Sequence, residues 1–132
     1  MSYQKLIELA KQDWKRNPDF AQACENVITK ISSKEAEAFR HLTFSSIKRL
    51  SESTLDTHDI VRLTQYLSGE RVGLFTTGFE YIGEEGNFIL DKENSHYAYH
   101  QNEIAHPDTG KVIKDVKNDV FMFFSLNEGG LK

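Results

Sequence analysis

The chain has few residues that support disulfide, redox or thiolate-metal chemistry. Its 132 residues include one cysteine, Cys24, and two prolines. A single cysteine excludes an intramolecular disulfide and a thiolate metal cluster. Cys24 lies on the apolar side of a predicted helix, so we interpret it as a small buried hydrophobic side chain. No apolar run is long enough to cross a bilayer, and the N-terminus lacks the apolar segment of a signal peptide. We therefore expect a cytoplasmic protein.

Motifs of the common enzyme classes are also missing. The sequence contains no glycine-rich phosphate loop, no nucleophile elbow, and no cysteine with matched histidine and asparagine. Gly78, between Thr77 and Phe79, indicates a bulge or a close backbone approach. Glu84 and Glu85 lie in a predicted turn, where water would screen them, whereas catalytic carboxylates need a dry cleft. We expect no cofactor, and the sequence favours a non-enzymatic protein.

Composition is that of an ordinary globular chain, which we expect to form a single domain over residues 1–132. Hydrophobic residues make up 39% and charged residues 27%, with a net charge of −4. The charge is uneven: residues 1–69 hold 10 Lys/Arg against 9 Asp/Glu, and residues 70–132 hold 6 against 11. Any contact with phosphate is therefore expected from the first half.

The first half has the apolar spacing of about four helices. The first runs from Tyr3 to Trp14, and Asn17-Pro18 starts a second that extends to Ile31. Ser32 and Glu35 have the spacing of a capping box, which predicts a third helix up to Leu50. The residues in its middle, Thr43 to Ser46, have low helix propensity, so this stretch is either one helix or two short ones. Asp56 caps the fourth helix and Gly69 ends it.

In the second half, apolar and polar residues alternate with the period of β-strands. Residues 72–81 and 88–90 predict a hairpin that turns at Gly83–Gly86. Residues 91–95 are interpreted as a loop. Residues 96–100 alternate as a strand does, although Ser95 could instead cap a short helix. Residues 120–126 are almost wholly apolar and predict a strand buried on both faces, followed by a polar tail at 127–132.

These patterns predict an α+β fold in which an N-terminal helical half packs on a C-terminal antiparallel sheet. We divide it into a helical extension (1–53), a helix plus hairpin (54–92) and the remaining sheet (93–126). The order helix, turn, helix, hairpin resembles a winged-helix unit. That resemblance concerns the order of elements and does not fix a function.

The first functional hypothesis is a small protein interaction module. If both sides of the strand at 120–126 are apolar, one side needs cover from this chain, from a partner protein or from a second copy in a homodimer. The aromatic residues expected to form this surface are Phe121, Phe123, Tyr97 and Tyr99. The acidic hairpin would set the charge of the partner.

The alternative is a DNA-binding regulator of the winged-helix type. The helix after Asp56 would then read the major groove through Arg62, Gln65 and His58, and Lys48 and Arg49 would bind phosphate. Acidic residues at the start of that helix and at the hairpin tip oppose this hypothesis, because phosphate contacts provide most of the nonspecific affinity.

The third hypothesis is a metal-dependent hydrolase built on His96, His100 and His106. On a strand, four residues span about 13 Å, too far for two imidazoles to share one zinc ion. On a helix, His96 and His100 would lie on the same face. The hypothesis therefore depends on whether this stretch is strand, helix or loop.

Overall fold

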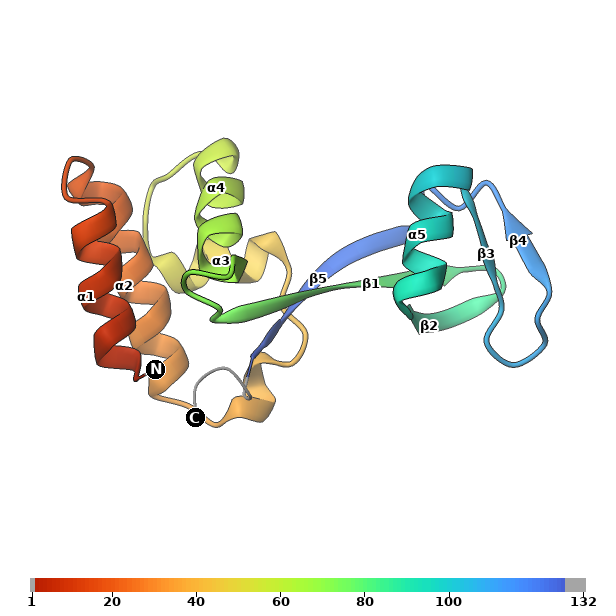
Figure 1. Ribbon diagram of the computed structural model, residues 1–132, viewed down its shortest axis with the longest axis horizontal. Helices are drawn as coiled ribbons and strands as arrows, with labels where there is room; N and C mark the ends of the chain where they lie inside the picture. Colours follow the sequence, from red (N-terminus) through yellow and green to blue (C-terminus); the bar gives the residue numbers. More distant parts are fainter. Residues whose placement is uncertain (1, 128–132) are drawn as a thin grey trace. The chain divides into compact units, whose positions relative to one another are not determined.

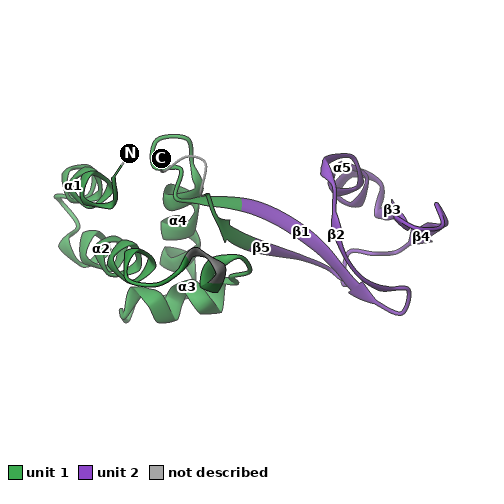
Figure 2. Ribbon diagram, turned by 90° about the horizontal axis from the view of Figure 1, so that it is seen from below, with its two compact units in different colours: residues 1–76, 124–132 green, residues 77–123 purple. Residues whose placement is uncertain are grey.

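The structure is a computed structural model that describes residues 2–127, apart from the side chains of residues 36 and 37. The predicted tail beyond residue 127 lies outside the described residues. The chain divides into two compact units (Figure 2): unit 1 comprises residues 1–76 and 124–132, and unit 2 comprises residues 77–123. Helices dominate the N-terminal part and antiparallel strands the C-terminal part, so the predicted α+β class is confirmed. Within residues 2–127, no helix has the length and apolar character required to cross a bilayer.

Unit 1 is built from helices whose ends are set by short polar side chains. The elements are α1 (Tyr3–Asp13), α2 (Pro18–Ser32), a 3-10 turn η1 (Ala36–Phe39), α3 (Phe44–Ser51) and α4 (Thr57–Ser68). The predicted caps are confirmed, because Asn17 accepts a hydrogen bond from the Phe20 amide and Asp56 accepts one from the Asp59 amide.

The predicted start of the third helix is wrong. Ser32 is the last residue of α2, and no side chain caps η1. The capping box forms instead between Thr43 and Ser46 at the start of α3. Of the two alternatives, the chain therefore forms two short helical segments. The first ends at Phe39, and α3 starts after Thr43, whose hydroxyl oxygen accepts a hydrogen bond from the Ser46 amide.

The core of unit 1 contains the apolar stripes of its helices. Phe20, Val27 and Ile28 of α2 are fully buried, and the Trp14 and Phe20 ring centroids are 4.2 Å apart. Cys24 is buried and unpaired as predicted, and this burial raises the pKa of its thiol to about 12.

Unit 2 holds parts of a three-stranded sheet with the order β2-β1-β5 (Figure 1). Strands β1 (Phe75–Gly83) and β5 (Val120–Leu126) run through both units, and β2 is Gly86–Leu90. The hairpin turn is confirmed, because Gly83 pairs with Gly86. A helix, α5 (Lys92–Gln101), follows, and then a separate two-stranded sheet of β3 (Glu103–Ala105) and β4 (Val112–Lys114).

Helix α5 replaces a predicted loop, and its second half settles the question left open for residues 96–100. Asp91 caps this helix by accepting a hydrogen bond of 2.7 Å from the Asn94 amide, and Asn102 ends it in a left-handed conformation. No residue of α5 is buried, so its sequence carries no apolar stripe. That missing stripe is the physical reason why the periodicity failed to reveal the helix.

One face of the unit 2 sheet packs on the core of this unit. Tyr81 and Leu90 are buried there with Ile104, Ile113 and Val116. Phe79, Phe88, Ala98 and Val120 pack against this cluster. The prediction that the last strand is buried on both faces is wrong at its beginning, since Phe121 and Met122 are exposed.

Candidate functional site

The best candidate for a functional surface is one face of the unit 2 sheet. It is the face opposite Tyr81 and Leu90, and we call it the outer face. Cross-strand pairing sets Glu80 opposite Ile89 and Ile82 opposite Asn87. Because successive side chains alternate between faces, Ile82 and Ile89 point away from the Tyr81 side. Both side chains are exposed.

Strand β5 contributes Phe121 to the same face. A hydrogen bond of 2.8 Å from the Ile82 amide to the Asp119 carbonyl aligns β5 with β1. Antiparallel alternation from that bond places Phe121 beside Glu80, on the outer face. Phe121 is 48% exposed.

Phe123 also lies on this face but does not form part of an open surface. Its ring covers Gly78, where an added Cβ would lie 2.6 Å from the nearest ring carbon. Phe123 is only 7% exposed. The close contact at Gly78 is therefore made by a side chain, not by the backbone as predicted, and the expected exposure of Phe123 is not present.

The two predicted tyrosines lie on α5, not on the sheet. Tyr97 is 38% and Tyr99 is 86% exposed. The structure thus does not bring the four predicted aromatic residues together on one sheet face. Sequence reasoning missed Ile82 and Ile89, although the alternation of the hairpin already places both opposite the buried set.

Exposed large hydrophobic side chains of the described residues all belong to unit 2. They are Ile82, Ile89, Tyr97, Tyr99, Val112, Phe121 and Met122. Single exposed apolar side chains are normal, but these seven all fall within the 47 residues of unit 2.

The residues of the DNA-binding hypothesis lie in unit 1, and its main candidate takes part in packing there. The Arg62 guanidinium lies 5.5 Å from the Trp14 ring and 5.4 Å from the Phe20 ring. Its Nη1 also donates a 3.2 Å hydrogen bond to Asp59. Pairing with guanine would compete with the hydrogen bond to Asp59.

The other DNA-binding candidates are exposed. Gln65 and His58 lie on α4, and Lys48 and Arg49 lie on α3 next to Glu52. No observation tests their role, and DNA binding stays a prediction.

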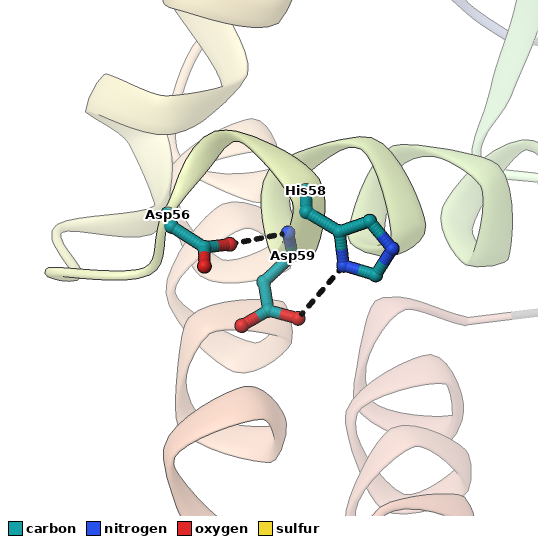
Figure 3. Close-up of side chains that lie close together, drawn as sticks. All are labelled: Asp56, His58 and Asp59. Carbon is teal, nitrogen blue, oxygen red and sulfur yellow. Dashed lines mark hydrogen bonds and ion pairs between the residues drawn. The ribbon is translucent and has the colours of Figure 1, made fainter.

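Acidic and imidazole groups gather at the start of α4 (Figure 3). Asp56, His58 and Asp59 each place a possible ligand atom within 4.8 Å of the others. Asp56 is occupied as the helix cap, with its Oδ1 2.8 Å from the Asp59 amide nitrogen. Asp59 pairs with Arg62, and its Oδ1 lies 3.8 Å from Nδ1 of His58. These partners explain the cluster as helix capping and local ion pairing.

The predicted metal ligands are brought together only in part. His96 and His100 lie one turn apart on α5, with ring centroids 4.2 Å apart. His106 instead contacts the Phe88 ring, and its Nδ1 accepts a hydrogen bond from the Asp108 amide. Among the described residues, the groups of three or more potential ligands include none of these histidines. The metal hypothesis stays a prediction.

One strong electrostatic contact lies in unit 1. The Arg71 guanidinium donates two hydrogen bonds of 2.8 Å to the Asp13 carboxylate, and the Tyr66 hydroxyl donates a third of 2.6 Å. The Arg71 hydrogen bonds hold the pKa of Asp13 below its usual value. Burial, together with the bond to Asp13, raises the pKa of Tyr66. The geometry is that of a structural clamp between α1 and the end of α4.

Comparison of the chain with protein-family models, with curated proteins and with solved structures finds no match.

Proposed function

We propose that this chain is a protein interaction module that docks a partner protein on the outer face of unit 2. The observation that carries the proposal is the exposure of three large apolar side chains, Ile82, Ile89 and Phe121, around Glu80 on the outer face. Fully burying an exposed side chain of this size contributes roughly 1.5–3 kcal/mol. Because Ile82, Ile89 and Phe121 are 42%, 65% and 48% exposed, each has about half of that contribution left to give on binding.

Charge supports a partner with basic residues. Residues 77–123 hold four Lys/Arg against nine Asp/Glu, a net charge of −5. Glu80 lies beside Phe121 on the outer face, and Glu84 and Glu85 lie at the hairpin tip. A second copy of the chain would bring like charges together, which disfavours the homodimer relative to a basic partner.

Cys24 is consistent with the expected cytoplasmic location, since buried unpaired cysteines are common where thiols stay reduced. No specific observation favours DNA binding or metal-dependent hydrolysis as a second candidate function.

Size-exclusion chromatography of the chain from its native host, with light scattering, tests the proposal. We expect a complex heavier than one chain that dissociates as salt increases, because a basic partner is held partly by charge. Phe121→Ser should shift the chain to the monomer position, and the control Gln65→Ser on α4 should not. A complex that Phe121→Ser leaves intact would contradict the proposal. A complex with the mass of two chains that becomes more stable as salt increases would contradict the basic partner and indicate a homodimer.

A further inference from the structure

A groove of about 560 Å³ lies on the side of unit 2 that carries α5. Its apolar lining comes from Phe79 of β1, Ala98 of α5, and Val120 and Met122 of β5. A groove of this size with mostly apolar walls falls within the usual range of small-molecule sites. The sheet separates it from the outer face, because Met122 and its neighbour Phe121 point to opposite sides of β5.

The ionisable residues lining the groove, other than the exposed Tyr99, are all bases. His96 and His100 come from α5, and Lys117 comes from the turn before β5. No aspartate or glutamate lines it, although unit 2 as a whole holds nine acids against four Lys/Arg. The local charge therefore has the opposite sign to that of its unit.

This charge pattern disfavours a chance surface depression and also disfavours a metal ion. A chance depression in an acidic unit would be expected to include acidic groups. A cation bound by His96 and His100 would lie in the same groove as the Lys117 ammonium, which would repel it.

We propose that this groove binds a small amphipathic organic anion. The apolar body of the ligand would pack on Phe79, Val120 and Met122. Its carboxylate, sulfonate or phosphate would accept hydrogen bonds from Lys117 and from the ring N–H groups of His96 or His100. This site goes beyond the proposed protein docking and does not depend on it, because it uses the other side of the sheet.

The test uses two fluorescent probes that share a ring system. 8-Anilinonaphthalene-1-sulfonate carries the anion, and N-phenyl-1-naphthylamine has the same rings without it. We expect the sulfonate to bind with a stoichiometry of one. Lys117→Glu should weaken binding of the sulfonate by roughly tenfold or more while changing binding of the neutral probe little, since a charge-assisted hydrogen bond is lost and a carboxylate that repels the anion is added. Lys114→Glu, at an exposed lysine of β4 that does not line the groove, is the matched control.

A second pair of variants locates the probe on the sheet. Met122→Ser should weaken the binding of both probes, and Phe121→Ser should change the binding of neither. Far-UV circular dichroism and the urea midpoint confirm that each variant is folded. Loss of sulfonate binding in Phe121→Ser, equal weakening by Lys117→Glu and Lys114→Glu, or absence of saturable binding would overturn the proposal. Retained probe binding in a chain that forms no protein complex would leave this site standing while the docking function fails.

Discussion

At Gly78, an added side chain and the ring of Phe123 would compete for the same space. A Cβ at this position would lie 2.6 Å from the ring, and the ring is itself buried. Gly78→Ala should therefore lower the free energy of unfolding by about 1–3 kcal/mol, as overpacking usually does. Urea denaturation measures the change. Gly69→Ala, where the nearest atom to an added Cβ is 3.4 Å away, is the control; equal effects of the two variants would refute the packing argument.

Asp13 provides a pH-dependent prediction, because its pKa in the folded chain lies below the ordinary value of 3.8. A carboxylate with a lowered pKa stabilises the fold above its unfolded pKa, and this contribution is lost as the pH falls through the folded pKa. Arg71→Met should therefore lower the urea midpoint at pH 7, and the difference from wild type should shrink below about pH 4. Lys15→Met, at an exposed lysine, controls for net charge. A difference that persists unchanged at low pH would show that Arg71 acts through packing.

Single residues with a clear stereochemical role were predictable from the sequence. Asn17 and Asp56 cap helices as expected, and Gly83 and Gly86 form the hairpin turn. The partner of Gly78 was not, because the sequence indicates that a glycine leaves space but does not identify the side chain that fills it. Ring packing of this kind depends on the register of β1 and β5, which lie far apart in the sequence.

Among the elements, α5 shows where pattern reasoning fails. Helices of unit 1 have buried stripes and were predicted, whereas α5 buries none of its residues. Besides the packing of Ala98 on the unit 2 core, it is held by the Asp91 cap and by Asn94. The Asn94 side chain donates a hydrogen bond to the Ala105 carbonyl and accepts one from the Ala105 amide, both 3.0 Å long. Such a side-chain link between a helix and β3 leaves no periodic signal.

Asn94 therefore allows a direct test of how α5 is held. Asn94→Asp keeps the acceptor but removes the donor, so a carboxylate oxygen would face the Ala105 carbonyl. We expect a loss of about 1–2 kcal/mol in the free energy of unfolding at pH 7. Amide hydrogen exchange at Ala105 should also become faster, because repulsion from the Ala105 carbonyl would move the whole carboxylate away from the Ala105 amide. Asn87→Asp, on exposed β2, adds the same charge elsewhere in unit 2 and should change neither quantity. Unchanged exchange at Ala105 would show that the paired hydrogen bonds do not hold α5.

On the scale of the whole molecule, the α+β class followed from two periods in the sequence, one helical and one alternating. The candidate surface was predictable only in part. Phe121 was identified from the apolar strand, but Phe123, equally apolar, is covered by its own chain. Ile82 and Ile89 complete the outer face because β2 pairs with β1 in a register that the turn at Gly83–Gly86 fixes.

Site-specific photo-crosslinking in the native host tests the docking proposal most directly. A benzophenone amino acid at position 121 would replace an exposed ring on the outer face, and the same group at position 65 on α4 is the control. We predict one discrete protein adduct from position 121 that Ile89→Ser abolishes, and no adduct from position 65. Equal adducts from both positions, or none from position 121, would contradict the proposal that the outer face docks a protein partner.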